Sequence, residues 1–403
     1  MTDRLYYSDP YLRAFDATVA RAERRDGRQL VTLDRTAFYP TSGGQPFDTG
    51  MLGGSRVVDV VDEEDGSISH VVEPGTQNLE LRTGDAVHGS IDWDRRFDHM
   101  QQHTGQHVLS AAFDRLFGVR TVSFHLGAEV STIDLAREMS PAEIAAAESE
   151  ANRIVWEDRP VAIRFADAEE AAKLPLRKEP ARGGVLRLID VEAFDLSACG
   201  GTHVARTGGI GAIAIASWER FRGGQRLEFV CGGRALGAFR TLRDAMTASV
   251  RLLSVLPVEL PSAIERVQAE AKDQKRSMAA LQHDLARYRA DGLAASAEDV
   301  AVRATGGRVR LVAHVVDADA NGLKTLASAI VSKPGFLAVL VSASSPALVV
   351  IARSPDLAVS SQHLLTQLTS EFGGRGGGKP DMAQAGGLVA SGDAILAAVR
   401  AAI

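Results

Sequence analysis

Cysteine and long apolar runs are scarce in this chain. Its 403 residues include two cysteines, Cys199 and Cys231, which excludes a framework of several disulfides and fits a reducing compartment. No uninterrupted apolar run approaches the ~20 residues that a membrane helix needs, and the N-terminal residues carry charges without the apolar core of an export signal. We therefore expect a cytoplasmic protein that does not associate with membranes.

Aromatic residues and net charge are also low. Aromatic residues make up 5% of the chain, so we expect a core of Ala, Val and Leu. The formal net charge of −6 argues against a protein that coats nucleic acid indiscriminately. Local groups of basic residues remain at 21–28, 177–187 and 220–234, and the simplest interpretation of each is a solvated surface.

The length of the chain predicts two or three domains, and its patterns divide it further. Residues 1–91 alternate short apolar runs with Gly, Pro, Asp and Ser, as in a small antiparallel barrel or sandwich, and we predict a β-barrel. Residues 92–250 begin with a helical pattern over 95–117. A capping box at Ser140 then opens a second helix before a series of strands, which predicts an α+β domain.

Helical spacing dominates the next part of the chain. Residues 251–298 are predicted to form a helical linker, because apolar residues step by four and three from Leu260 to Tyr288. A coiled coil between chains and a long helix packed on its own chain both produce this pattern. Residues 299–403 are predicted to form an α/β domain, which completes a multidomain α+β protein. It contains a glycine-rich segment, residues 373–387, whose backbone N–H groups are suited to phosphate.

Two short motifs carry the chemistry. HTGQH places His103 and His107 four residues apart, on one face of a helix. CGGTH supplies Cys199 and His203, and its two glycines let the backbone turn tightly between them. One thiolate and three imidazoles suit a tetrahedral zinc ion. We predict that these side chains bind one Zn²⁺.

The residues alone leave the purpose of this ion open. Zinc proteases of the H-E-x-x-H type carry a glutamate after the first histidine; here that position is Thr104, which excludes that reaction. Four protein ligands are usual for a structural ion, whereas catalysis needs an open position. His99 lies on the same helical stripe as His103, where we expect it to support a ligand or contact a substrate.

Taken in this order, HTGQH and CGGTH resemble the editing domain of alanyl-tRNA synthetase and its free-standing relatives, the AlaX-type trans-editing proteins. The loop FYPTSGGQPFDTG, residues 38–50, is similar to the glycine-rich loop that precedes this domain. GGRGGGKPDMAQAGG, residues 373–387, is similar to the glycine-rich signature of the synthetase's C-terminal domain. The resemblance covers essentially the whole chain and points to the long form of the AlaX group.

The resemblance implies a trans-editing hydrolase that removes serine from mischarged alanine tRNA by zinc-assisted ester hydrolysis, with glycine as a second candidate. Because the sequence starts at the barrel, we expect ATP-independent hydrolysis without aminoacylation. The resemblance also implies tRNA binding by the C-terminal domain and a homodimer through that domain or the helical linker. Residues expected to orient water, read the serine hydroxyl or close the pocket are Thr104, Gln106, Gln45, Asp48 and His125; those expected to contact tRNA are Arg375, Gly376, Gly377, Gly378 and Lys379.

Two alternatives stay open. The first is a non-enzymatic tRNA-binding protein whose zinc only holds the fold together. The second is a hydrolase of another aminoacyl ester such as threonyl-tRNA, because the related threonine-specific synthetase carries a similar editing fold. No carboxylate in the sequence stands out as a general base.

Overall fold

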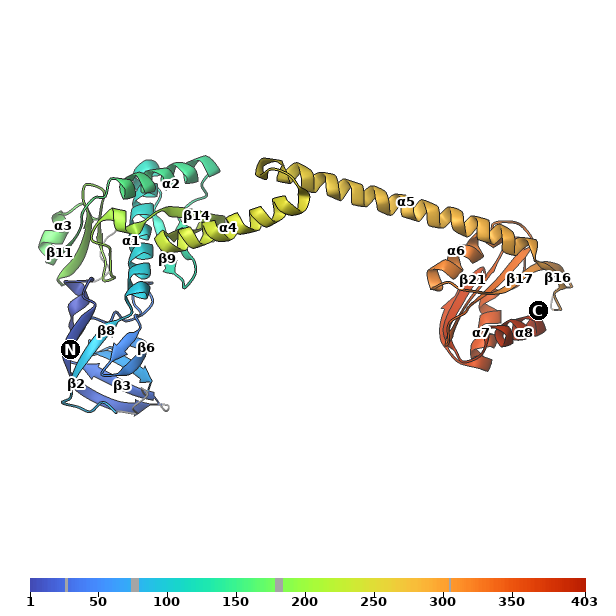
Figure 1. Ribbon diagram of the computed structural model, residues 1–403, viewed down its shortest axis with the longest axis horizontal. Helices are drawn as coiled ribbons and strands as arrows, with labels where there is room; N and C mark the ends of the chain where they lie inside the picture. The colour runs from blue at the N-terminus through green and yellow to red at the C-terminus, as the bar shows by residue number, and fades with distance from the viewer. Residues whose placement is uncertain (26–27, 74–79, 178–183, 304–305) are drawn as a thin grey trace. The chain divides into compact units, whose positions relative to one another are not determined.

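The computed structural model describes residues 1–25, 28–73, 80–177, 184–303 and 306–403. The chain forms two units, Met1–Ser249 and Val250–Ile403 (Figure 1). Among the described residues, no single helix is long and apolar enough to cross a membrane. One consecutive pair, Gly232–Leu253 and Pro257–Ala295, meets the length and composition criteria only when its helices are taken together.

The first unit begins with a closed barrel, as predicted. Its elements and the short segments before it are β1 (Asp3–Arg4), η1 (Leu5–Tyr7), β2 (Ala14–Arg25), β3 (Arg28–Leu33), β4 (Arg35–Thr36), β5 (Gly50–Leu52), β6 (Ser55–Asp62), β7 (Ile68–Glu73) and β8 (Ala86–Ile91). The barrel closes in the order β2-β3-β7-β6-β5-β8. Alternate residues such as Val19, Val31 and Val57 point inward and are buried, which gives the barrel its own aliphatic core.

A long buried helix, α1 (Trp93–Phe117), leads from the barrel into the rest of the unit (Figure 1). The Asp92 side chain caps its first turn by accepting from the backbone N–H of Arg95, and Gly118 ends it with a left-handed φ of 63°. Most residues of α1 between His99 and Phe113 are buried, because the helix packs on a second helix and on a β-sheet. The HTGQH motif therefore lies in the interior.

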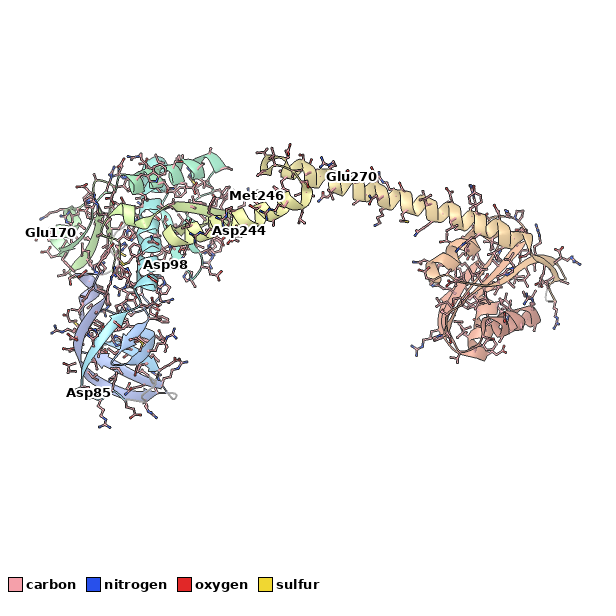
Figure 2. All side chains as sticks on the ribbon, in the orientation of Figure 1. Asp85, Asp98, Glu170, Asp244, Met246 and Glu270 are labelled. Atoms are coloured by element: carbon pink, nitrogen blue, oxygen red, sulfur yellow. The ribbon has the colours of Figure 1, made fainter. Side chains whose placement is uncertain are left out.

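Two sheets, three further α-helices and the 3₁₀ helix η2 follow, and the first unit ends at Ser249 within the last of these helices. They consist of β9 (Thr121–Leu126), β10 (Ser131–Leu135), α2 (Pro141–Trp156), β11 (Val161–Ala166), α3 (Ala168–Lys173), β12 (Leu186–Val191), β13 (Asp195–Ala198), η2 (Thr207–Ile210), β14 (Ile213–Phe221), β15 (Gly224–Cys231) and α4 (Gly232–Leu253). The sheets run β14-β15-β10-β9 and β11-β12-β13. The predicted capping box of Ser140 and Glu143 starts α2. Helix α4 was not predicted from the sequence. Near the start of α4, Arg234 donates to the carboxylate of Asp98 on α1 at 2.6 Å; Asp98 is labelled in Figure 2.

The second unit is built around one mixed sheet. Its elements are η3 (Pro257–Glu259), α5 (Leu260–Ala295), β16 (Glu298–Ala301), β17 (Arg308–Val316), α6 (Ala320–Val331), β18 (Phe336–Ser342), β19 (Ala347–Arg353), α7 (Ser361–Phe372), β20 (Arg375–Gly378), β21 (Met382–Leu388) and α8 (Gly392–Ala402). The strand order is β16-β17-β18-β19-β21-β20. The C-terminal end of α5 packs with α6 on one face, and α7 and α8 cover the other (Figure 1). This arrangement agrees with the predicted α/β domain.

The predicted heptad seam lies on α5, but most of it faces outward. Ile264 is 44% exposed, Met278 59%, Leu281 66% and Tyr288 69%. Within the described part of the chain, α5 buries only alanines, such as Ala286 and Ala290. The coiled coil between chains therefore stays a prediction.

The glycine-rich segment 373–387 forms an edge hairpin of the sheet, in which β20 pairs with β21. A Cβ placed on Gly376 would lie 2.1 Å from the carbonyl oxygen of Gln384. Glycine is therefore required here for the close approach of the two strands.

Candidate functional site

The four predicted metal ligands come together in the first unit. The ligand atoms of His103, His107, Cys199 and His203 all lie within 4.8 Å of one another. The sulfur of Cys199 is 3.3 Å from Nε2 of His103 and 3.3 Å from Nε2 of His203. These separations are close to the ~3.5 Å between sulfur and nitrogen ligands around a tetrahedral zinc ion. The donor set and its spacing thus fit the predicted metal.

Each imidazole makes a hydrogen bond through its Nδ1 atom, on the side of the ring away from the centre. Nδ1 of His103 donates to Oε1 of Gln45 over 2.8 Å, and Nδ1 of His107 donates to Oδ2 of Asp195 over 3.2 Å. Because these oxygens only accept hydrogen bonds, the proton is placed on Nδ1 and the Nε2 lone pair is left for the centre. Such partners orient metal ligands in proteins.

Thr104 orients the third imidazole. Its hydroxyl donates to the carbonyl oxygen of Met100 at 2.8 Å, and it accepts from Nδ1 of His203 at 3.2 Å and from the N–H of Val204 at 3.1 Å. One donor and two acceptor positions are thereby used. Thr104 is fully buried and does not line the cavity beside the centre. The contact with substrate expected from its sequence position has no support in this geometry.

Asp195 joins His107 to two further polar side chains. Its carboxylate accepts from Nε of Arg177 at 2.6 Å and from the Ser197 hydroxyl at 2.9 Å. Burial raises the pKa of Asp195, but His107 and Arg177 outweigh burial and hold it well below its usual range. Sequence reasoning missed Asp195, although it alternates with Ser197 and Cys199 in DLSAC and therefore shares a strand face with the ligand.

The glycine-rich loop of the barrel reaches the centre through Gln45. This side chain is fully buried. Besides His103, its Oε1 accepts from the backbone N–H of Thr202 at 3.0 Å, and its Nε2 donates to the Thr202 hydroxyl at 2.8 Å. Gln45 thus connects the barrel loop, α1 and CGGTH. Its expected role in closing the pocket stays a prediction, and in the structure it holds a candidate metal ligand, His103, in place.

Asp48 anchors the same loop to α1. Its carboxylate pairs with the guanidinium of Arg96, both side chains being fully buried, and it accepts from the N–H of Tyr39 at 2.6 Å. Arg96 also donates to the carbonyl oxygen of Pro10 at 2.9 Å and to that of Ala37. Its charge and donors are therefore largely satisfied, as a buried ion pair requires.

The glycines of both motifs are dictated by close packing at the centre. A Cβ on Gly201 would lie 2.1 Å from Cε1 of His103, and a Cβ on Gly105 would lie 2.3 Å from the sulfur of Cys231. A larger residue at either position would push α1 away from CGGTH or from β15. Cys231 itself is fully buried and lies outside the ligand cluster.

The charges at the centre favour metal binding. Burial raises the pKa of the Cys199 thiol, but His103, His203 and His107 outweigh burial and hold that pKa well below its usual range. The thiolate is the form that binds metals. Burial lowers the pKa of His107, but Cys199 and Asp195 outweigh it and raise that pKa to about 9. A cation that binds His107 must displace a proton, so we expect metal affinity to rise with pH.

A cavity of about 260 Å³ adjoins the centre. Cys199 and His107 lie in its wall, together with Gln106, which is 3% exposed. Gln106 Nε2 donates to the Ser110 hydroxyl at 2.8 Å, while its Oε1 is buried and has no partner among the described residues. The other lining residues are Tyr39, Ser42, Gly43, Thr121, Val122, Ser123, Phe124, Arg177, Ser197, Ala198, Gly200 and Gly201.

Two histidines named from the sequence stand apart from this cavity. His125 lies on β9 and is exposed, and Phe124 beside it lines the cavity in its place. His99 is 3% exposed, and its Nδ1 has no partner in the described part of the chain. Burial, followed by the charge of Arg95, lowers the pKa of His99 to about 4. His99 is therefore neutral near pH 7.

The residues expected to contact tRNA lie in the second unit. All four residues of β20, from Arg375 to Gly378, are exposed, and Lys379 follows them in the turn of the hairpin. Arg375, Gly376 and Gly377 line a hollow of about 150 Å³ with Gln384.

Three family models match separate parts of the chain. "tRNA synthetases class II (A)" matches residues 10–95, which contain the six strands of the barrel. "Threonyl and Alanyl tRNA synthetase second additional domain" matches residues 186–228, including CGGTH. The "DHHA1 domain" matches residues 308–403, most of the second unit.

Similar proteins cover nearly all of the chain. An alanine–tRNA ligase of Pyrococcus abyssi is 34% identical over 95% of this chain, which spans 42% of that ligase. The alanyl-tRNA editing protein AlaX-L of Pyrococcus horikoshii is 32% identical over 95% of this chain and 94% of its own length. The crystal structure of the C-Ala domain of Aquifex aeolicus alanyl-tRNA synthetase matches 26% of the chain at 19% identity, with a TM-score of 0.23.

Proposed function

Because the chain belongs to the family of alanyl-tRNA editing proteins, we propose that it is an aminoacyl-tRNA deacylase. The proposed reaction is hydrolysis of the ester bond of alanine tRNA mischarged with serine, and with glycine as a second substrate. The observation that carries the proposal is the convergence of His103, His107, Cys199 and His203, two of which, His107 and Cys199, line a cavity of about 260 Å³. We expect the cavity to receive the amino acid and the terminal adenosine.

These four side chains would hold a zinc ion, which supplies a Lewis acid that polarises water or the ester carbonyl. The protein contributes orientation: Gln45, Asp195 and Thr104 each fix the Nδ1 side of one histidine. The burial of the histidines, none more than 4% exposed, excludes bulk water and strengthens the electrostatic interactions at the centre.

Gln106 is suited to distinguish serine from alanine. Its Oε1 lacks a hydrogen-bond partner among the described residues, and a hydroxyl of the bound amino acid would provide a donor. Bound alanine would leave this buried acceptor unpaired, and unpaired buried groups give strong discrimination between substrates. We expect Gln106→Leu to reduce the preference for seryl- over alanyl-tRNA by roughly tenfold or more.

We also assign tRNA contact and dimerisation to residues 299–403. The exposed Arg375 and Lys379 of the β20–β21 hairpin support the tRNA contact. The exposed seam of α5 supports a second site for pairing with another chain.

The alternative is a tRNA-binding protein with a structural zinc ion. It is favoured by one observation: four protein ligands with supported histidines resemble a closed structural site. Against it, Cys199 is only half-buried and lies with His107 in the cavity wall.

Initial rates on seryl-, glycyl-, threonyl- and alanyl-charged tRNA, with metal content measured on the same preparation, separate these functions. His103→Ala should lower the seryl-tRNA rate at least about a hundredfold and reduce bound zinc. His125→Ala is the matched control, because this exposed histidine lies outside the cavity. Unchanged hydrolysis by folded His103→Ala protein would rule out a zinc-centred reaction, and a preference for threonyl-tRNA would replace the proposed substrate.

A further inference from the structure

A row of side chains leads away from the candidate metal centre across the sheet β11-β12-β13. Phe165 of β11 stands opposite Arg187 of β12 in the strand register. The pairing of Leu188 with Ala198 places Arg187 opposite Cys199, and Cys199 N–H donates to the carbonyl oxygen of Arg187 at 3.0 Å. Residues directly opposite in antiparallel strands point to the same face. Cys199, Arg187 and Phe165 therefore lie side by side on one face.

Arg187 in the middle of this row is a buried cation that pairs with no carboxylate among the described residues. Its side chain is held by backbone oxygens: Nη1 donates to Cys199 and Gly201 at 2.7 and 2.9 Å, and Nε donates to Tyr7 at 2.9 Å. Its Nη2 has no hydrogen-bond partner in the part of the chain that the structure describes. Its charge is balanced by these carbonyl dipoles and by the nearby Cys199 thiolate, and Nη2 can still donate a hydrogen bond.

A groove of about 600 Å³ begins where this row ends. Tyr7 and Phe165 line it together with residues 1–4 and Ser8, and the side chain of Phe165 is 52% exposed. The guanidinium groups of Arg4 and Arg187 lie 5.6 and 5.4 Å from the centre of the Tyr7 ring.

The groove adjoins the first cavity at Tyr7. A Cβ placed on Gly200 would lie 3.5 Å from the Tyr7 hydroxyl, and Gly200 lines the cavity beside the metal ligands. Tyr7, which lines the groove with Phe165, therefore lies beside a residue of the cavity wall.

We propose that this groove binds the unpaired nucleotides that precede the terminal adenosine of the aminoacylated RNA, with Phe165 stacking on a base. The proposal rests on the proposed function, because the ester fixes the terminal adenosine at the metal centre. Aromatic faces beside arginines are how proteins bind single-stranded RNA without reading its sequence. Asp3 lines the same groove and Asp62 pairs with Arg4 at 2.6 Å, so stacking contributes more here than net charge.

Hydrolysis of two substrates tests the groove. Seryl-charged alanine tRNA fills both the cavity and the groove, whereas 3′-O-seryl-adenosine fills only the cavity. Phe165→Ala should lower kcat/KM for the tRNA by roughly five- to a hundredfold, through KM, and change that for seryl-adenosine less than about twofold. Phe165→Tyr should restore the tRNA value. Because stacking is not screened by salt, the loss should persist at higher ionic strength.

Trp156→Ala is the matched control, since Trp156 is 76% exposed and lines neither the cavity nor the groove. It should leave both substrates unaffected. If Phe165→Ala lowers kcat/KM equally for both substrates, or for neither, the groove proposal is contradicted and the proposed function is unaffected. If the wild-type protein hydrolyses neither substrate, the proposed function itself fails, and the groove proposal fails with it.

Photocrosslinking gives an answer independent of turnover. Alanine tRNA with 5-iodocytidine immediately before the terminal adenosine should crosslink to Tyr7 or Phe165, as mapped by mass spectrometry of the full-length protein. Crosslinks confined to the second unit, or to other parts of the first, would contradict the proposal.

Discussion

The two glycine-rich segments CGGTH and RGGGKP occupy opposite surroundings. In CGGTH, Gly201 lies against the buried ring of His103, and the polar groups around it are hydrogen-bonded. In RGGGKP, the four residues of β20 are exposed, and Gly376 lets β20 approach β21 closely. The same residue type thus builds a rigid centre in one unit and an accessible edge in the other. The comparison teaches that glycine content by itself does not identify a binding loop.

The largest effect on stability should come from removing the guanidinium group of Arg96, which pairs with Asp48 of the barrel loop. Arg96→Leu leaves Asp48 buried without its partner, and we expect a loss of about 3–5 kcal/mol of stability. Arg353→Leu in the second unit is the control, because Arg353 donates to backbone carbonyls and pairs with no carboxylate among the described residues. Urea unfolding of both variants measures the difference; equal losses would show that the first unit is not more dependent on buried charge.

The next effect concerns metal affinity. Gln45→Leu removes the acceptor for Nδ1 of His103, and we expect zinc affinity to fall about 10- to 100-fold. Gln101→Leu is a matched control on α1, since Gln101 bonds to the backbone of Gly209 and Gly233 and to no ligand. Competition with a chelator measures both; equal affinities in the two variants would show that Gln45 only closes the loop.

The stability of the two units should also respond differently to acid. His70 is fully buried in the barrel between Thr36 and the carbonyl oxygen of Val31, and burial lowers its pKa to about 4. The unfolded chain therefore binds more protons between pH 6.5 and 4, so stability is present above pH 6.5 and is lost as the pH falls through this window. We expect His70 to account for a loss of about 2 kcal/mol at pH 5 relative to pH 8.

Urea unfolding at pH 8 and pH 5 checks this effect. His70→Gln should remove about 2 kcal/mol of the difference between the two pH values. Amide hydrogen exchange should place the wild-type acid loss in the first unit, because none of the histidines of the second unit, His283, His314 and His363, is buried. An identical pH dependence in wild type and variant would contradict the assignment to His70.

The smallest effect is expected at the exposed edge. A Cβ on Gly377 meets nothing within 4 Å, so Gly377→Ala should change stability by less than about 0.5 kcal/mol. Gly376→Ala should cost more, because its Cβ would meet the backbone of β21. Thermal unfolding compares the two; equal midpoints would show that the hairpin can shift to accept a side chain.

Local signals predicted much of the fold. The capping box at Ser140 and the helical spacing around HTGQH are patterns of neighbouring residues. The first correctly predicted the start of α2 and the second correctly predicted α1. Helix α4 was missed, and it is largely exposed with only Ala235 buried. The β20–β21 hairpin was also missed, because its glycines carry no strand propensity and are explained only by the backbone of β21.

The sequence by itself determined which side chains are suited to a metal ion, because the spacing of two histidines on a helix and a tight glycine turn are local properties. Only the tertiary structure decided which side chains hydrogen-bond to those candidate ligands. The partners of the three histidines, Gln45, Asp195 and Thr104, are separated from them by 58, 88 and 99 residues. Hydrogen bonds over such distances depend on how barrel, helix and sheets pack together, and no local pattern encodes that packing.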